Sequence, residues 1–223
     1  AYAGGLGGLA AIGRKPRRTG IFYGLAVAGC FLGTGLAPTL PLLAIAPVAW
    51  WLSPDRPKAL HTLLIGLAIA AVLILPWPLL LLNLEPARFH GWLATELAPL
   101  KTPFSLDGGG RFIAMLPWFA FPAFPLAIWT LRLRRRDIKA PAQLLPLVFL
   151  LITLLLLAWA YRPRQIPALL LLPPLALLAT PGALALRRGA ANAFDWFAMS
   201  TFSVFIGIVW LAWSAMALGW PGQ

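Results

Sequence analysis

The chain has 223 residues, of which 61% are hydrophobic and only 11% are charged, and its net charge is +12. Soluble domains carry about 25% charged residues, so this composition excludes an ordinary water-soluble domain and favours a protein embedded in a membrane. The basic residues form short clusters between apolar runs, a pattern that argues against nucleic-acid binding and favours a role in membrane topology.

Seven apolar segments that can enter a bilayer alternate with polar turns. In chain order they are residues 20–36, 40–52, 60–82, 112–131, 144–160, 166–186 and 194–218. Because one crossing needs about 20 apolar residues, we expect an all-α membrane bundle with roughly six to seven spans. The second segment is short and is expected to be tilted or partly re-entrant. Prolines are expected to kink the sixth segment at Pro173, Pro174 and Pro181.

The segment before the first span, residues 1–12, is apolar and rich in Gly and Ala, and no basic region precedes it as in a signal peptide. We expect it to be the end of a helix. The whole chain, 1–223, is expected to form a single transmembrane bundle that is a fragment or a degenerate half of a longer membrane domain.

The longest polar stretch, residues 83–110, follows the third span. It predicts an interfacial helix over 87–97 and then a flexible loop that closes with three glycines. Glu85 and Arg88 are three residues apart and can pair on a helix, whereas Glu96 lies on another part of the segment. Two interpretations are open. The stretch is a solvated interfacial helix with local ion pairs, or it binds an anionic ligand or a sugar, with His90 as a further contact.

Lysine and arginine positions predict the orientation of the spans. If the first basic run faces the cytoplasm, the inner loops hold thirteen bases: Arg14, Lys15, Arg17, Arg18, Arg56, Lys58, Arg132, Arg134, Arg135, Arg136, Lys139, Arg187 and Arg188. The outer loops then hold five: Arg88, Lys101, Arg111, Arg162 and Arg164. Since cytoplasmic loops carry the excess of Lys and Arg, the loop 83–110 and the C-terminus are expected to face outward.

Few residues suggest chemistry. The motifs of soluble enzymes are absent, and with two histidines and one cysteine a metal site is not expected. Arg162 and Arg164 flank a proline in an outer turn, where they can bind a phosphate or simply anchor at lipid headgroups. The cluster Arg132–Arg136 is interpreted as a topology signal. The triplet Gly33-Thr34-Gly35 is explained by a small-residue helix contact.

Several stretches, read in order, resemble the lipid-dependent glycosyltransferases of the GT-C class, in the protein O-mannosyltransferase and aminoarabinose transferase group. They are Gly24–Pro41, Val72–Pro78, the Glu85-Pro86-Ala87-Arg88-Phe89-His90 motif leading to Glu96, Arg111–Trp118, Arg164–Pro167 leading into Leu172–Ala176, and the last helix, Asp195–Trp213. The resemblance covers nearly the whole chain, although each motif alone is weak.

This resemblance implies a function. Such enzymes move a sugar from a polyprenyl-phosphate carrier to an acceptor, such as lipid A, at the outer face of the bacterial inner membrane. It implies substrate contacts by Glu96, Arg162 and Arg164, and further substrate-binding residues at Glu85, Arg88 and His90. A carboxylate would activate the acceptor or hold a metal, and cations would stabilise the leaving phosphate.

The sequence also departs from that group. The family's acidic catalytic pair lies in an early outer loop, and nothing here corresponds to it, so this chain is expected to hold the later half of the bundle and its own catalysis stays open. No cofactor is evident, and a divalent metal would need ligands from a preceding part. Gly33-Thr34-Gly35 replaces Thr-Lys-Gly, and Gln165–Leu169 replaces a Lys-x-Pro-x-Tyr pattern.

Two further hypotheses stand beside the enzyme. The chain can be a noncatalytic descendant that serves as an accessory or structural subunit and packs against other membrane proteins. A transporter or channel is disfavoured, because no predicted span carries a charged residue at its centre. The expected partners are therefore membrane lipids, a polyprenyl-phosphate sugar donor and other membrane subunits, without nucleic acid.

Overall fold

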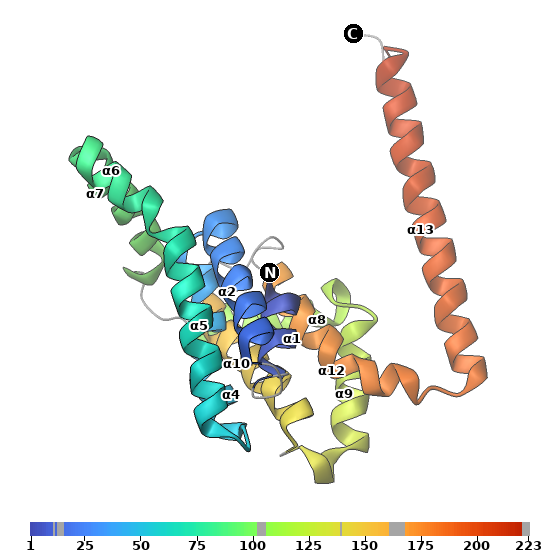
Figure 1. Ribbon diagram of the computed structural model, residues 1–223. Coiled ribbons are helices and arrows are strands. Elements are labelled where there is room, and N and C mark those ends of the chain that lie inside the picture. Colours follow the sequence, from blue (N-terminus) through green and yellow to red (C-terminus); the bar gives the residue numbers. More distant parts are fainter. Residues whose placement is uncertain (11, 13–15, 102–105, 139, 161–167, 220–223) are drawn as a thin grey trace. The chain divides into compact units, whose positions relative to one another are not determined.

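The computed structural model describes residues 1–223 except 11, 13–15, 102–105, 139, 161–167 and 220–223. Every regular element among the described residues is a helix, which confirms the all-α fold (Figure 1). By contacts between Cα atoms the chain divides into two compact units, residues 1–181 and 182–223. The expectation of a single bundle over the whole chain stays a prediction.

Among the described residues, unit 1 contains the helices up to α12. These are α1 (Tyr2–Ala10), α2 (Pro16–Thr34), α3 (Leu36–Ala44), α4 (Ala46–Leu52), α5 (Arg56–Ile74), α6 (Pro76–Leu84), α7 (Pro86–Leu97), η1 (Ala98–Lys101), α8 (Leu106–Phe119), α9 (Ala123–Leu133), η2 (Arg135–Asp137), α10 (Pro141–Ala160), η3 (Leu169–Leu171) and most of α12 (Leu172–Leu184). Unit 2 holds the end of α12 and the long helix α13 (Arg188–Ala217).

Among the residues that the structure describes, three helical segments are long and apolar enough to cross a membrane: Arg56–Leu84, formed by α5 and α6, then Pro141–Ala160 and Arg188–Ala217. Their lengths of 29, 20 and 30 residues are sufficient for a crossing of about 20 residues, so the structure supports membrane association. Two other expected spans are shorter apolar helices, Leu36–Leu52 and Leu169–Leu184. The count of six to seven spans stays a prediction.

The expected fourth span is not one straight helix. Its two parts, Gly109–Phe119 and Ala123–Leu133, are bent by 100° and together make either a broken span or a re-entrant loop. The break contains Pro122, and Pro125 follows it. Because proline has no backbone N–H, the helical hydrogen-bond ladder cannot continue unbroken across this stretch.

The flexible loop expected before Gly110 is wrong over part of its length. Helix α8 already begins at Leu106 and includes the three glycines. Phe112 and Leu116, one turn apart, are fully or almost fully buried. Packing of this face outweighs the low helix propensity of glycine, since most helix stability in proteins comes from tertiary contacts. Residues 102–105 lie outside the described residues.

Helices α2 and α5 of unit 1 pack closely against each other. A Cβ added at Gly24 would lie only 2.4 Å from the carbonyl oxygen of Gly66, and one at Gly20 would lie 2.7 Å from the carbonyl oxygen of Thr62. The two helices approach so closely because these positions carry no side chain. The sequence also predicted a small-residue helix contact at the Gly33-Thr34-Gly35 triplet. This prediction is wrong at Gly33, where nothing lies within 4 Å of an added Cβ.

Helix α10 joins the two apolar clusters of the core. In its N-terminal half Phe149 is completely buried and meets the Tyr2 ring of α1 edge to face, with 5.0 Å between ring centroids. Nearer its C-terminal end Leu157 packs with Phe112 of α8 and Leu175 of α12. Tyr23 of α2 donates a 2.8 Å hydrogen bond to the carbonyl oxygen of Leu42, so this buried hydroxyl is satisfied.

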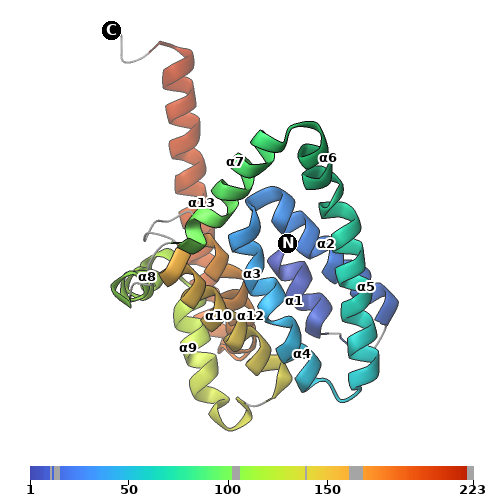
Figure 2. The ribbon, with the colours of Figure 1, turned by 90° about the vertical axis from the view of Figure 1, so that its left-hand side faces the viewer.

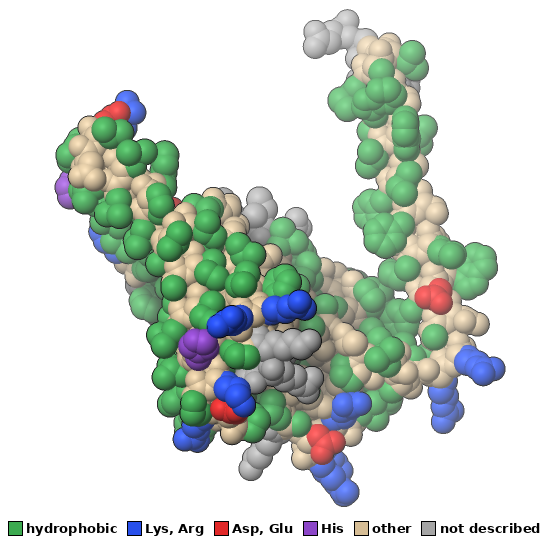
Figure 3. All heavy atoms as spheres, in the orientation of Figure 1, with side chains coloured by type: hydrophobic (Ala, Val, Ile, Leu, Met, Phe, Trp, Pro, Cys, Tyr) green, Lys and Arg blue, Asp and Glu red, His purple; other side chains and the backbone are tan. Residues whose placement is uncertain are grey.

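The two ends of unit 1 differ in their chemistry. Figures 1 and 2 place α4, the start of α5 and the end of α9 at one end of this unit, and α6 and α7 at the other. Arg56 and Lys58 belong to the first end, as does the run Arg132–Arg136. Figure 3 shows Lys and Arg side chains around these lower helix ends. This arrangement agrees with the predicted orientation, which nonetheless stays a prediction.

Candidate functional site

The sequence-predicted residue Glu96 lies at the junction of three helices. It is in the last turn of α7, half-buried, and its Oε2 accepts a hydrogen bond of 2.6 Å from the backbone N–H of Leu36, the first residue of α3. Gly35 separates α3 from α2 and has no side chain of its own to cap α3. A glutamate 60 residues away therefore satisfies one of the free N–H groups at this helix start.

Glycine is required where the three helices meet. Gly35 has φ +89°, a value that L-residues other than glycine rarely adopt, and its N–H donates to the carbonyl oxygen of Phe31 over 2.8 Å. A Cβ at this position would lie 2.7 Å from Oε2 of Glu96. Gly35 thus ends α2, starts α3 and leaves room for the carboxylate.

Aromatic packing fixes α7 against α2. Trp92 lies one turn before Glu96, on the same face of α7, and its ring meets that of Phe31 edge to face, with 6.5 Å between centroids. The Trp92 ring also contacts Phe89 at 5.9 Å. Because Trp92 and Glu96 are four residues apart, one helix face carries both an apolar anchor and a carboxylate. The packing of Trp92 and the hydrogen bond from Leu36 therefore both hold the carboxylate in place.

The position of Glu96 limits the chemistry that it can perform. A helix N-terminus attracts anions, but at α3 the Glu96 carboxylate already occupies this place. The site as built is therefore unsuited to a phosphate. Within the described residues the second oxygen, Oε1, has no hydrogen-bond partner, so it can accept one from a sugar hydroxyl, an amine or water.

The remaining predicted residues on α7 lie apart from this junction. Glu85 and Arg88 form the expected ion pair, with 2.6 Å between Oε2 of Glu85 and Nε of Arg88, and both are exposed. This confirms the predicted pairing. An exposed pair of this kind contributes little to stability. His90 is exposed, and its ring contacts the neighbouring Phe89 at 5.7 Å. The structure therefore does not bring Glu85, Arg88 and His90 together with Glu96.

Arg162 and Arg164, which were predicted to lie in an outer turn, fall outside the described residues, since they belong to 161–167. Their predicted contact with a phosphate stays a prediction. In the described part of the chain, no group of three or more His, Cys, Asp or Glu residues is placed to hold a metal ion.

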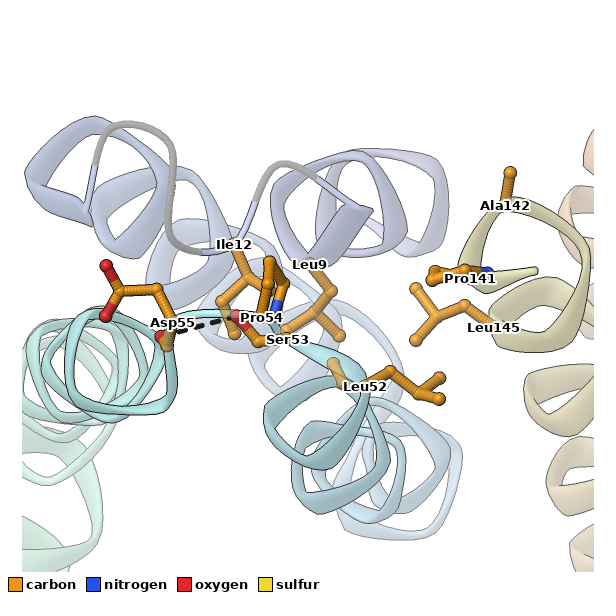
Figure 4. A pocket seen from close by; sticks show the side chains of 10 residues that line it. Leu9, Ile12, Leu52, Ser53, Pro54, Asp55, Pro141, Ala142 and Leu145 are labelled. Carbon is orange, nitrogen blue, oxygen red and sulfur yellow. Dashed lines mark hydrogen bonds between the residues drawn. The ribbon is translucent and has the colours of Figure 1, made fainter. Parts of the chain in front are cut away.

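A separate cavity of about 450 Å³ opens beside the turn between α4 and α5 (Figure 4). Its lining is mostly apolar, with Leu9 and Leu52 among the side chains, and Leu145 of α10 faces them. The hydroxyl of Ser53 donates to the carbonyl oxygen of Asp55 over 3.3 Å. The Asp55 carboxylate points away from the apolar side chains in Figure 4.

The Asp55 carboxylate is paired with Lys58. Lys58 lies 2.5 Å from the Asp55 carboxylate and lowers the pKa of that carboxyl, mainly through a side-chain hydrogen bond and then through its backbone N–H. Asp55 is thus the N-cap of α5 and not a free acid. The cavity therefore offers apolar surface but no unengaged carboxylate.

Sequence reasoning named Glu96 but missed its partners. Gly35 and the backbone N–H of Leu36 carry no motif that predicts contact with a distant helix. The one signal in the sequence is that Pro38 and Pro41 follow Gly35 closely, which favours a helix boundary and hence a helix start that needs a cap. The tight contact of Gly20 and Gly24 had a signal, because two glycines four residues apart favour close helix packing.

The chain matches no known protein-family model, no curated protein and no solved structure. The resemblance to the GT-C group therefore depends on the motifs in the sequence alone.

Proposed function

We propose that this chain is a membrane-embedded part of a glycosyltransferase that moves a sugar from a polyprenyl-phosphate carrier to an envelope acceptor such as lipid A. In this proposal the chain lies in the bacterial inner membrane and places α7 on the outer side. It crosses the membrane six or seven times, because one crossing needs roughly 20 apolar residues. Glu96 is the residue that meets the acceptor or the sugar.

The observation that carries the proposal is the fixed carboxylate of Glu96. One oxygen is held by the N–H of Leu36, and the other has no partner among the described residues. A transferase of this type needs a group that hydrogen-bonds the attacking hydroxyl or amine and takes its proton. A carboxylate that is already oriented supplies this without having to be ordered when the substrate binds.

The location of α7 also supports the proposal. Helices α6 and α7 lie at the end of unit 1 opposite the start of α5 (Figures 1 and 2). By the positive-inside rule, the end that holds the start of α5, with Arg56 and Lys58, is cytoplasmic. A lipid-linked sugar on the outer leaflet would then reach α7 from the membrane surface. Arg162 and Arg164 are proposed to bind its phosphate, a role that Glu96 itself cannot fill.

The test compares two matched variants in membrane vesicles that contain this protein. Transfer is measured from undecaprenyl phosphate carrying mannose or aminoarabinose to lipid A, and binding of undecaprenyl phosphate is measured separately. Glu96→Gln keeps the size and can still accept from Leu36, but it loses the basic carboxylate. We expect transfer to fall about a hundredfold or more, the usual contribution of a general base. Binding of undecaprenyl phosphate should change little.

Glu85→Gln is the control, because Glu85 is an exposed residue paired with Arg88 and should leave transfer unchanged. Equal transfer by the wild type and the Glu96 variant would contradict the role of Glu96. If the wild-type protein neither transfers a sugar nor binds undecaprenyl phosphate, the enzyme proposal fails. The accessory-subunit hypothesis then takes its place, and a stoichiometric membrane partner should co-purify.

A further inference from the structure

The turn that follows α9 carries a dense group of cations. Arg132 lies in the last turn of α9, Arg134 caps this helix, and Arg135 and Arg136 belong to η2. All four are exposed. The one acid in the turn, Asp137, is exposed as well, and within the described residues no ion pair involves any of these arginines. The turn therefore presents a net positive surface that no acidic group of the described chain neutralises.

The helix that leads into this turn presents an apolar side to its surroundings. Ala127 and Thr130 of α9 are buried, and the Thr130 hydroxyl donates to the carbonyl oxygen of Leu126 over 2.9 Å. Trp129 and Leu133, four residues apart and thus on one face, are 49% and 53% exposed. An exposed tryptophan one turn from a row of arginines is the arrangement that anchors a helix at the boundary between acyl chains and headgroups.

We propose that the α9 end and the turn after it, residues 129–136, form a binding surface for the headgroups of anionic phospholipids. The phosphates would be bound by the guanidinium groups of Arg134, Arg135 and Arg136, while Trp129 and Leu133 lie among the first carbons of the acyl chains. Arginine suits this role because its planar fork can donate two hydrogen bonds to one phosphate.

This surface differs from the site at Glu96 and does not depend on the proposed function. A topology signal needs only positive charge in the loop. The structure adds that the arginines are unpaired in the described part of the chain and that an apolar face with a tryptophan adjoins them. Charge complementarity thus favours phosphatidylglycerol or cardiolipin over a neutral lipid such as phosphatidylcholine.

The experiment measures lipid retention by the purified protein with native mass spectrometry, using phosphatidylglycerol and phosphatidylcholine as probes. The wild type is expected to retain phosphatidylglycerol in preference to phosphatidylcholine. The triple variant Arg134→Gln, Arg135→Gln and Arg136→Gln should retain phosphatidylglycerol about tenfold less, because each juxtamembrane cation contributes substantially to the attraction. Trp129→Ala should weaken retention of both lipids.

Two controls keep the proposal falsifiable. The triple variant Arg134→Lys, Arg135→Lys and Arg136→Lys keeps the charge but loses the planar fork, so its retention of phosphatidylglycerol should fall between that of the wild type and that of the Gln variant. Wild-type retention by the Gln variant would contradict the proposal. The double variant Arg17→Gln and Arg18→Gln removes exposed charge from α2 and should change little. If the α2 double variant lost as much phosphatidylglycerol as the Gln triple variant, retention would reflect diffuse electrostatic attraction and the proposal would be overturned. Displacement of the lipid by an equal concentration of inorganic phosphate would also overturn it.

Discussion

Glu96 shows what a single residue contributes at the junction of α2, α3 and α7. Its carboxylate gives α3 the cap that Gly35 cannot supply, and its 2.6 Å hydrogen bond from the N–H of Leu36 ties α7 to α3. Sequence reasoning selected Glu96 as a polar residue near hydrocarbon. It could not find Leu36, because a backbone N–H has no sequence signature and lies 60 positions away.

The first prediction at this scale concerns Gly35. Gly35→Ala should destabilise the protein, because φ +89° with ψ −173° is a conformation essentially restricted to glycine that costs another residue about 1–3 kcal/mol, and the new Cβ would meet Oε2 of Glu96 at 2.7 Å. The measurement is thermal unfolding in detergent. Gly33→Ala is the matched control, since open space surrounds its added Cβ, and it should leave the unfolding temperature unchanged or slightly raised.

A double-mutant cycle separates the two causes. In a Glu96→Ala background the steric conflict is gone, so Gly35→Ala should cost only the backbone strain and the two substitutions should be non-additive. Purely additive effects would show that Gly35 and Glu96 act independently and would contradict the described geometry.

At the scale of elements, the sequence predicts helices better than it predicts their contacts. The helix expected over 87–97 is confirmed as α7, Pro86–Leu97, since Pro86 can start a helix where no N–H is needed, whereas its interfacial location stays a prediction. The span expected over 144–160 lies within α10, Pro141–Ala160, and both end at Ala160. The bend between α8 and α9 was not predicted, because a proline-rich apolar run satisfies the length of a span whether or not it stays straight.

The contact between α2 and α5 gives the next prediction. Gly24→Ala would place a methyl group 2.4 Å from the carbonyl oxygen of Gly66 and force the two helices apart. Overpacking of this kind typically costs about 1–3 kcal/mol, so the unfolding temperature should fall. Gly29→Ala on the same helix meets nothing within 4 Å and should be neutral or stabilising, because alanine favours helix by about 0.5–1 kcal/mol. Equal effects at both positions would contradict close packing at Gly24.

At the scale of the whole molecule, the orientation in the membrane decides which surfaces can meet which substrates. The basic ends of α5 and α9 lie opposite α7 within unit 1 (Figures 1 and 2). Composition predicted the membrane setting, because an 11% charged content cannot cover a water-soluble surface. The number of crossings does not follow from it, since apolar runs such as residues 40–52 are long enough to enter the bilayer but short for a full span.

Labelling of single cysteines tests this orientation and the path of the α8–α9 pair. In a Cys30→Ser background, cysteines replace Arg88, Gly110, Lys58 or Arg134, all of them exposed. A membrane-impermeant maleimide is applied to spheroplasts before and after permeabilisation. We expect Arg88→Cys and Gly110→Cys to react at once, and Lys58→Cys and Arg134→Cys to react only after permeabilisation, because the more basic loops stay in the cytoplasm.

The result at Arg134 distinguishes the two paths that a 100° bend allows. If α8 and α9 together cross the bilayer, Gly110→Cys and Arg134→Cys react from opposite sides. If they form a re-entrant loop, both react from the same side, and the spans that follow take the reverse orientation. The arginines after α9 would then face outward with α7, which would place the phospholipid surface in the outer leaflet and add their charge to the side where the sugar donor is proposed to bind.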